Sequence, residues 1–390
     1  MTKTPRRTLD TRLVRAGSDP KKFDGAVNPP PQRASTVLMP TAEELYAPGV
    51  KTYGLVGMAA HDALKSALCE MEDARDCLLT ASGLIACTLP IFALAGAGGH
   101  ILVTDSVYGP TRRYCDRSLK RWGCETEYFD PDIGAGIEAL IRPETQLIFL
   151  ESPGSLTFEI QDTPAITEIA RKHGVPTALD NTWGAGVYYK PLDLGVDVSI
   201  HATTKYPAGH SDVLSGAILT RDPLIGARIA QASTDLGMMV SAEDAYLTLR
   251  GLRTMMTRLR QHEASAYDVA DWLAARPEVD RILHPGRPDD PYHALWKRDF
   301  TGSAGLFGMV LKPCDEAQVL AFLNALTLFG LGFSWGGYES LAIHCDPQLD
   351  RTLGRPDFAG PLLRFSIGLE SPTDLKADLA NAFEASGIRA

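Results

Sequence analysis

An aspartate and a lysine each follow an apolar run of the sequence. A carboxylate and an amine can accept and donate protons, so the two side chains could act together as acid and base on one bound molecule. Asp180 follows the run 175–179, and Lys205 lies just beyond the run 196–200. The 25 residues from Asp180 to Lys205 can hold one crossover connection, so the two runs can be parallel neighbours in a sheet. Because open α/β sheets bind ligands at the carboxyl ends of their strands, we expect both side chains at one ligand site.

Lys205 has two interpretations. A lone lysine after a strand is most often a solvated surface residue. Its ε-amine can instead bind the aldehyde of pyridoxal phosphate, while Asp180 keeps the pyridine nitrogen of that cofactor protonated so that the ring accepts electrons. The string at 197–212 is DVSIHATTKYPAGHSD. It resembles the lysine signature of the Cys/Met-metabolism family of pyridoxal-phosphate enzymes, and this resemblance favours the second interpretation.

Two further segments of the sequence contain residues that could bind the phosphate and the ring of that cofactor. Ser82-Gly83-Leu84 opens a predicted helix, where backbone N–H groups favour a phosphate; the alternative is an ordinary N-cap. Tyr108 follows the apolar run 101–104 and would lie at the ligand end of the sheet, although a lone tyrosine is more often a packing residue. The first string resembles the family's phosphate loop, with Leu84 in place of Met, and the second resembles its ring-stacking motif.

The C-terminal part of the chain supplies candidates for binding an amino-acid substrate. Arg364 lies inside the apolar run 362–367. A buried arginine needs a partner, which is either an internal carboxylate or the carboxylate of a bound amino acid. The string FSWGGYES at 333–340 contains Ser334 and Trp335. It resembles the segment that helps to hold the substrate carboxylate in the β-lyase branch of the family, and this favours the substrate as the partner of Arg364.

The resemblance covers nearly the whole chain. The string ESPGS at 151–155 is the form seen in β-lyases, whereas the γ-synthase and γ-lyase branches usually carry ESP-x-NP. The family implies a fold-type I, aspartate-aminotransferase-like α/β fold, with a mostly parallel central sheet in a large domain and a smaller C-terminal α/β domain. It also implies a homotetramer, a dimer of dimers, in which Tyr53 of one subunit reaches the phosphate and substrate of its neighbour. Thr204 is expected at the phosphate as well.

The activity that the resemblance implies is carbon–sulfur β-elimination. L-cystathionine would be cleaved to homocysteine, pyruvate and ammonia, a step of methionine biosynthesis. Lys205 would remove the Cα proton, Asp180 would keep the ring nitrogen charged, and Tyr108 would stack on the ring and contact the substrate. The alternatives are a β-lyase for cystine or another cysteine S-conjugate, a cystathionine γ-lyase, γ-synthase or methionine γ-lyase, and a non-catalytic binding or regulatory protein of the same fold.

Four positions depart from the family's pattern. Leu55 stands where the family usually has a phosphate-binding arginine, and Met58 replaces a threonine. Val56 stands where β-lyases often have a second arginine near the far end of the substrate, and Ala202 replaces a phosphate-binding serine. The sequence names no basic residue that compensates. The loss at Leu55 is the only feature that supports the non-catalytic alternative.

Composition limits the class of protein. The chain has 390 residues, 45% of them hydrophobic and 22% charged, as in ordinary globular proteins. The net charge of −10 argues against nucleic-acid binding, and the longest apolar stretch, 84–97, is too short to span a bilayer. Neither end offers a targeting segment, and seven cysteines without C-x-x-C spacing suit free thiols in a reducing cytosol. We expect a cytoplasmic protein without a metal site, since the histidines form no ligand pattern.

Alternating apolar runs and helical patterns must position these residues. Residues 1–58 are rich in Pro and Gly and are expected to form an arm that contacts a neighbouring subunit. Residues 59–250 alternate strands and helices and are expected to form the cofactor-binding domain with a mostly parallel sheet. Residues 251–390 are expected to form the smaller domain. A long helix or helix pair in 242–275 should join the two.

Overall fold

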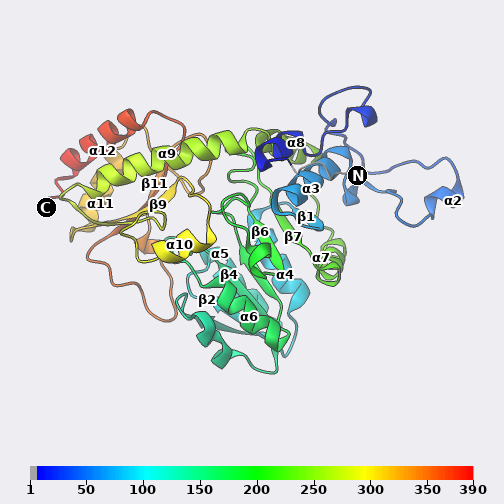
Figure 1. The fold of residues 1–390 in the computed structure, drawn as a ribbon, viewed down its shortest axis with the longest axis horizontal. Coiled ribbons are helices and arrows are strands. Elements are labelled where there is room, and N and C mark those ends of the chain that lie inside the picture. The colour runs from blue at the N-terminus through cyan, green and yellow to red at the C-terminus, as the bar shows by residue number, and fades with distance from the viewer. Residues whose placement is uncertain (1–6, 390) are drawn as a thin grey trace.

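Two β-sheets with helices packed on them make up the body of the protein (Figure 1). The structure is a computed structural model, and it describes residues 7–389. The larger sheet has seven strands in the order β1-β7-β6-β5-β4-β2-β3. Their bounds are β1 Asp76–Thr80, β2 His100–Thr104, β3 Glu125–Phe129, β4 Thr145–Glu151, β5 Thr177–Asp180, β6 Val198–His201 and β7 Gly216–Thr220. The five strands from β6 to β3 are parallel and β7 is antiparallel to its neighbours, which confirms the predicted mostly parallel sheet.

Alternate residues of the central strands β4, β5 and β2 enter two different hydrophobic cores. Ile148 and Leu150 of β4 belong to one core, and Leu147 and Phe149 belong to the other. The first core contains residues of α3 (Ala59–Glu72), α6 (Thr163–His173) and α8 (Ala242–Leu252). The second contains residues of α4 (Gly83–Leu94), α5 (Gly109–Tyr114) and α7 (Pro223–Asp235). A parallel sheet covered on both faces requires continuous apolar strands, which is why these runs could be read from the sequence.

The smaller sheet lies in the C-terminal part of the chain. Its order is β10-β11-β12-β9-β8, with β8 Val279–Leu283, β9 Leu306–Leu311, β10 Gly330–Leu331, β11 Leu341–His344 and β12 Leu362–Ser366. A third core joins it to α9 (Met255–Ala274), α11 (Glu316–Ala325) and α12 (Pro372–Ser386). The short helix α10 (His293–Asp299) lies between β8 and β9 in sequence. No helix within residues 7–389 is both long and apolar enough to cross a membrane.

The predicted bridge between the sheets is a pair of helices, α8 and α9. They are separated at Arg253 and Thr254, and α9 runs from the larger sheet towards the smaller one (Figure 1). Gly251 in the last turn of α8 has no room for a side chain, because a Cβ atom there would lie 2.1 Å from the carbonyl oxygen of Ala208. This close approach brings α8 against the loop that carries Lys205.

The N-terminal segment has two parts. Helix α1 (Leu9–Arg15), which the sequence did not predict, packs on the body through Leu13, and Arg253 donates hydrogen bonds to the backbone oxygens of Leu13 and Val14. The following residues, with the short helix α2 (Ala42–Leu45), project away from the body (Figure 1). Large apolar side chains are exposed along this projecting part, namely Val27, Leu38, Leu45, Tyr46, Val50, Tyr53 and Val56.

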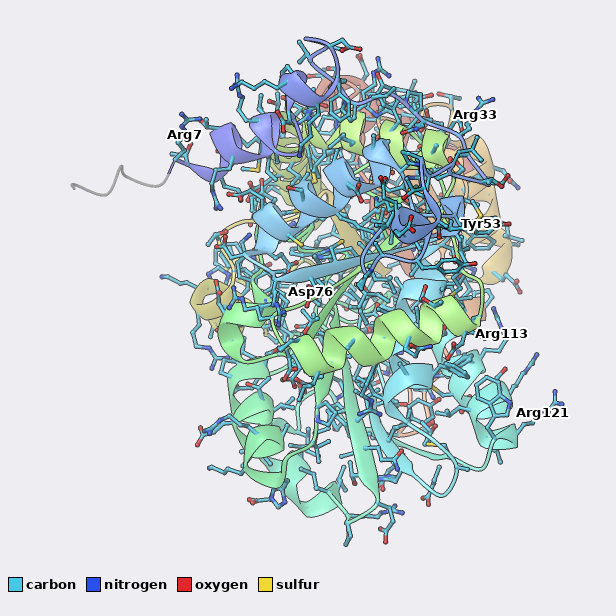
Figure 2. The ribbon with its side chains drawn as sticks, turned by 90° about the vertical axis from the view of Figure 1, so that its right-hand side faces the viewer. Arg7, Arg33, Tyr53, Asp76, Arg113 and Arg121 are labelled. Carbon is cyan, nitrogen blue, oxygen red and sulfur yellow. The ribbon has the colours of Figure 1, made fainter. Side chains whose placement is uncertain are left out.

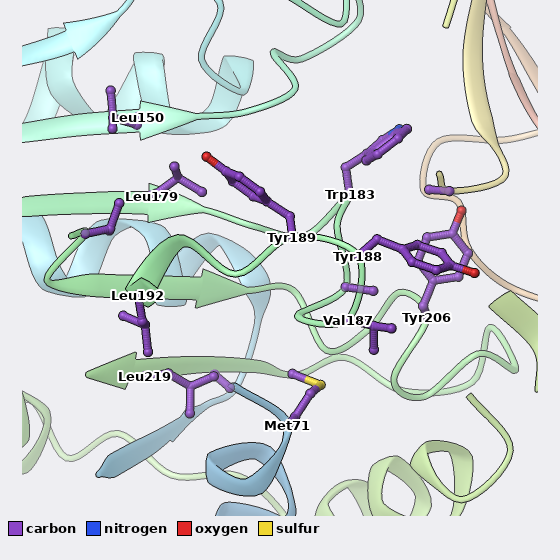
Figure 3. Packing of buried hydrophobic residues seen from close by; sticks show 14 of the residues in the cluster. Met71, Leu150, Leu179, Trp183, Val187, Tyr188, Tyr189, Leu192, Tyr206 and Leu219 are labelled. Carbon is purple, nitrogen blue, oxygen red and sulfur yellow. The ribbon is translucent and has the colours of Figure 1, made fainter. Parts of the chain in front are cut away.

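Aromatic packing fixes the loop that follows β5 (Figure 3). The ring of Tyr189 stacks on Phe300 with 4.1 Å between centroids, and Trp183 meets Phe300 edge to face. The indole Nε1 of Trp183 donates a hydrogen bond to the carbonyl oxygen of Leu306 at 3.1 Å. Because Leu306 begins β9, the loop after Asp180 is fastened directly to the smaller sheet.

Candidate active site

A cavity of about 1080 Å³ lies at the carboxyl ends of β4, β5 and β6 and is closed on one side by residues of the smaller sheet. A volume of this order can hold a cofactor together with a small ligand. Its lining includes every residue that the sequence proposed for the site except Tyr53, namely Ser82, Gly83, Leu84, Tyr108, Asp180, Thr204, Lys205, Ser334, Trp335 and Arg364. Residues up to 282 positions apart in sequence, from Ser82 to Arg364, therefore meet at one cavity.

Asp180 ends β5 and Lys205 lies in the loop after the adjacent strand β6, in agreement with the predicted pair of parallel neighbours. β5 and β6 are parallel, with Asp180 in register with Ile200. The Nζ atom of Lys205 donates a hydrogen bond to the Oγ of Ser334 at 2.7 Å and lies 5.3 Å from the centre of the Trp335 ring. Burial and the charge of Arg364 lower the pKa of Lys205 to about 8, although Asp180 opposes the shift. The amine is therefore deprotonated far more easily than an ordinary lysine.

Arg364 has no acidic partner within the described part of the chain. Its Nη2 donates to the carbonyl oxygen of Ser334 at 2.9 Å, and its buried Nε has no hydrogen-bond partner. Burial lowers the pKa of Arg364, with Cys345 and Tyr108 opposing the shift. Of the two partners that the sequence left open, the internal carboxylate is thus excluded among residues 7–389. A guanidinium with a free edge in a cavity suits a carboxylate ligand.

The carboxylate of Asp180 is held by three donors. Its Oδ1 accepts hydrogen bonds from the backbone N (3.0 Å) and the Oγ1 (2.5 Å) of Thr182, and its Oδ2 accepts one from the thiol of Cys87 at 3.3 Å. Donors of this kind stabilise the negative charge of a buried carboxylate. Asp180 is therefore suited to neutralise a cationic ring nitrogen.

The start of α4 forms a tight cradle beside the Lys205 loop. The Oγ of Ser82 accepts a hydrogen bond from the N–H of Ile85, which leaves the first N–H groups of the helix for a ligand. A Cβ atom on Gly83 would lie 2.4 Å from the Cβ of Ala202, so only glycine permits this approach. The hydroxyl of Thr204 donates to the carbonyl oxygen of Ser215 at 3.0 Å, so its proton is already in use.

Tyr108 and Glu151 both line the cavity and contact each other. The backbone N–H of Tyr108 donates to the Oε2 of Glu151 at 2.6 Å, and Tyr108 as a whole residue is 44% exposed in this chain. Burial, with Cys87 and Glu151 nearby, raises the pKa of the Tyr108 phenol. The ring thus stays neutral and is free to stack on a flat ligand.

A buried glutamate joins the two strand ends that carry the acid and the amine. Glu72, the last residue of α3, is 1% exposed. Its Oε1 accepts hydrogen bonds from Asn181 Nδ2 at 2.8 Å, Ser199 Oγ at 3.0 Å and His201 Nε2 at 2.5 Å. Because Asn181 follows Asp180 and His201 ends β6, this carboxylate fixes the spacing of β5 and β6 at the site. The sequence offered no signal for this contact, since Glu72 is remote in the chain.

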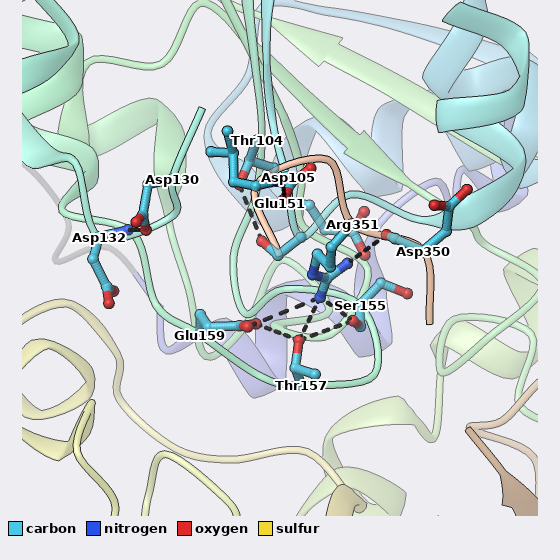
Figure 4. Close-up of polar contacts among 12 residues, drawn as sticks. Thr104, Asp105, Asp130, Asp132, Glu151, Ser155, Thr157, Glu159, Asp350 and Arg351 are labelled. Atoms are coloured by element: carbon cyan, nitrogen blue, oxygen red, sulfur yellow. Dashed lines mark hydrogen bonds and ion pairs between the residues drawn. The ribbon is translucent and has the colours of Figure 1, made fainter. Parts of the chain in front are cut away.

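A second polar network fastens the segment 350–355 of the C-terminal part to the larger sheet (Figure 4). Arg351 donates to Thr157 Oγ1 at 2.6 Å and to the carbonyl oxygen of Ser155 at 3.2 Å. Asp105 accepts hydrogen bonds from the backbone N–H groups of Thr352 and Leu353, both at 2.9 Å. These hydrogen bonds hold the segment in a position where Asp350 and Arg355 line the cavity.

Several lining residues were missed by the sequence analysis. They are Cys87 and the charged side chains of Arg112, Arg113, Asp116, Arg117, Asp350 and Arg355. Cys87 could have been found, because it lies four residues after Gly83 and so on the same face of the predicted helix. The segment 350–355 carries no pattern that places it at the cavity.

Tyr53 lies outside the cavity of its own chain. Its side chain is 55% exposed on the surface of the projecting segment, where Figure 2 labels it. Thr36 forms an isolated β-bridge with Tyr53. The expectation that Tyr53 serves a neighbouring subunit stays a prediction, because the structure contains one chain.

The donor set of the cavity fits pyridoxal phosphate. An amine with a lowered pKa, an acid for the ring nitrogen, an aromatic ring and a helix N-terminus lie in one lining, in a cavity of sufficient volume. The cradle at Gly83 supplies backbone donors for a phosphate even though the sequence lacks the usual arginine.

Comparison with known proteins agrees with this fit. The chain is 44% identical to the cystathionine beta-lyase of Bordetella avium (98% of this chain and 99% of that protein covered) and 44% identical to the cystathionine beta-lyase MetC of Escherichia coli (96% and 98%). The solved structure of a cystathionine gamma synthase from Xanthomonas oryzae pv. oryzae superposes with a TM-score of 0.90 at 32% identity, covering 98% and 99%. The family model for Cys/Met metabolism PLP-dependent enzymes matches residues 10–384, and the chain belongs to that family.

Proposed function

We propose that the protein is a carbon–sulfur β-lyase that cleaves L-cystathionine to homocysteine, pyruvate and ammonia. The single observation that carries the proposal is the meeting of Lys205, Asp180 and Arg364 at one cavity. The two relatives named cystathionine beta-lyase are also more similar in sequence to this chain than the gamma synthase is. This difference favours β-lyase over γ-lyase and γ-synthase chemistry.

The residues of the site have separate tasks in this reaction. Bound pyridoxal phosphate supplies the electron sink for the charge that develops at Cα. Arg364 binds the α-carboxylate with the free edge of its guanidinium and so orients the Cα–H bond. The Nζ of Lys205, with its pKa lowered to about 8, then removes the Cα proton. The proton is held on Nζ, which lies 2.7 Å from the Oγ of Ser334.

The remaining residues would bind and orient the cofactor and the substrate. Asp180 keeps the ring nitrogen cationic, because its carboxylate is fixed by Thr182 and Cys87. The ring of Tyr108 would stack on the cofactor. Trp335 would line the part of the cavity that binds the substrate. Ser82, Gly83, Leu84 and Thr204 surround the phosphate, with the N–H groups at the start of α4 as its donors.

The proposal includes a homotetramer with shared active sites, and the projecting arm supports a contact with a partner subunit. Leu38 is 88% exposed and Tyr46 is 83% exposed, and such apolar side chains gain stability when a partner covers them. We include in the proposal that the arm predicted for residues 1–58 packs on a neighbouring subunit through its projecting part and brings Tyr53 to the cavity of that subunit. Residues 59–250 and 251–390 would then be the cofactor-binding domain and the smaller domain.

A product assay tests the function. The purified protein is supplied with pyridoxal phosphate and incubated separately with L-cystathionine, L-cystine, methionine and O-acetylhomoserine, and pyruvate and 2-oxobutyrate are measured. Pyruvate and homocysteine from L-cystathionine, at a higher kcat/KM than for cystine, are the expected result. 2-Oxobutyrate as the main product would contradict the β-lyase assignment, and a preference for cystine would change the substrate. The variant Lys205→Ala is the control for non-enzymatic release.

A further inference from the structure

Glu151 is a carboxyl group in the cavity lining to which the proposed reaction gives no task. It ends β4 and its Oε2 accepts the hydrogen bond from the backbone N–H of Tyr108 at 2.6 Å. Its other side-chain oxygen has no hydrogen-bond partner among residues 7–389, and the side chain lines the cavity. One oxygen of the Glu151 side chain is therefore bonded to the protein, and the other is available to a ligand in the cavity.

Asp180 lies beside Glu151 in the larger sheet. β4 and β5 are parallel neighbours, and Glu151 is in register with Asp180. Asp180 receives three hydrogen bonds from Thr182 and Cys87, whereas the side chain of Glu151 receives one. When two buried carboxyl groups share a site, the group with more donors keeps the negative charge and the other keeps a proton.

The cation that favours a negative charge on Glu151 is also bound to other groups. Arg351 from the loop after β11 is the basic residue that acts on it, but Arg351 donates to Ser155 and Thr157 and lies 3.9 Å from Glu159 (Figure 4). Glu159 adds a second negative group near Glu151, and the thiol of Cys87 is directed at Asp180. Burial and the charge of Asp180 raise the pKa of Glu151 well above its ordinary value.

We propose that Glu151 is a positioning residue that carries a proton in the folded protein. Its Oε2 holds the backbone of Tyr108, and its O–H on the other oxygen donates a hydrogen bond to an acceptor atom of the molecule bound in the cavity. The Glu151 carboxyl group thus binds both the backbone of Tyr108 and the ligand. It therefore holds the Tyr108 ring and the ligand in a fixed relative position. The inference rests on the site arrangement given under the proposed function, but not on the identity of the thioether that is cleaved.

Two substitutions test whether the hydrogen-bonding atoms of Glu151 support cofactor binding. Glu151→Gln keeps the size of the side chain and both an acceptor and a donor, as a protonated carboxyl group has. Glu151→Met keeps a similar length but has no donor and only a weak sulfur acceptor. We expect Glu151→Gln to weaken the binding of pyridoxal phosphate less than threefold, and Glu151→Met to weaken it about tenfold, the usual cost of lost hydrogen bonds. Titration of the full-length protein with the cofactor, followed by absorbance, measures both.

Infrared spectroscopy reads the proton directly, without any lyase activity. The difference spectrum of wild type minus Glu151→Gln at neutral pH should contain the carbonyl band of a protonated carboxyl group. The same difference for Glu138→Gln, an exposed residue that pairs with His173, gives the bands of an ionised carboxylate. Carboxylate bands for Glu151, or equal cofactor affinities for Glu151→Gln and Glu151→Met, would overturn the proposal. An inactive protein that shows the protonated band would instead refute the proposed function alone.

Discussion

The Nζ of Lys205 donates a hydrogen bond of 2.7 Å to the hydroxyl of Ser334, which lies in the loop between β10 and β11 and lines the same cavity. The carbonyl oxygen of the same serine accepts a hydrogen bond from Arg364. The backbone of Ser334 is left-handed, with φ at 75°, a conformation that costs about 1–2 kcal/mol for a residue with a side chain. One strained residue thus sets the distance between the amine that moves the proton and the cation that binds the carboxylate.

Two variants of Ser334 should distinguish the effect of its strained backbone from the effect of its hydroxyl hydrogen bond. Ser334→Ala removes the hydroxyl and keeps the strain, whereas Ser334→Gly removes both. We expect kcat to fall about tenfold in both variants, because an amine loses its hydrogen-bond partner. Denaturant unfolding should show the glycine variant to be about 1 kcal/mol more stable than the alanine variant. An alanine variant at least as stable as the glycine variant would mean that the left-handed backbone is not strained.

Arg364 should determine the affinity for the substrate. In Arg364→Lys the charge is kept but the planar guanidinium is lost, so the grip on a carboxylate weakens. We expect KM for L-cystathionine to rise at least tenfold, since a charge-assisted hydrogen bond is worth about 1.5–3 kcal/mol. The control is Arg281→Lys on the outer part of β8, which should leave KM unchanged. Steady-state kinetics measures both, and an unchanged KM in Arg364→Lys would argue against this role.

Lys205 should make the stability of the cofactor-free chain depend on pH. The pKa of Lys205 is lowered to about 8 from an ordinary 10.5. Between these two values the unfolded chain binds a proton that the folded chain lacks, so stability rises with pH in this window. Below a pH of about 8 the folded chain bears the full cost of charging the buried amine, about 3 kcal/mol for this difference in pKa.

Replacing Lys205 by methionine removes that cost. Cofactor-free Lys205→Met should be more stable than the cofactor-free wild type at neutral pH, and its advantage should shrink as the pH approaches about 10. Urea unfolding of both proteins at the two pH values measures the difference. An advantage that does not change with pH would show that the amine is charged equally in both states.

Asp105 should hold the segment 350–355 on the larger sheet. It forms a buried ion pair with Arg112 at 2.5 Å and accepts the N–H groups of Thr352 and Leu353. Asp105→Asn leaves the Arg112 charge without an ionised partner, which costs about 3–5 kcal/mol for a buried pair. The control Asp130→Asn, at an exposed position in the same region, should change the unfolding free energy by less than about 0.5 kcal/mol. Similar values for the two variants would show that the ion pair contributes little.

The larger sheet could be predicted from the sequence because its strands are buried on both faces. Such strands are unbroken apolar runs, as at 101–104 and 147–150, and turn residues separate them. The strands of the smaller sheet were harder to find. β8 carries the charged Asp280 and Arg281, and β11 is four residues long, so neither gives a clear pattern. Helix α1 was missed because its contact with α3 is not visible in its own residues.

The candidate site could be predicted where a residue follows a strand or opens a helix. Asp180, Lys205 and Gly83 obey that rule, and the cavity contains all three. Glu72 and Arg351 act through contacts between remote parts of the chain, which no local pattern encodes. The place of Tyr53 depends on a second subunit and stays a prediction.

Peptide mapping after reduction tests most directly whether Lys205 carries the cofactor. The protein is saturated with pyridoxal phosphate, reduced with borohydride so that the link to the amine becomes permanent, and digested for mass spectrometry. We predict that the cofactor mass is found on the peptide that contains Lys205, and that Lys205→Ala loses this mass together with the visible absorbance. A label on Lys190 or another lysine, with Lys205 unmodified, would contradict the account.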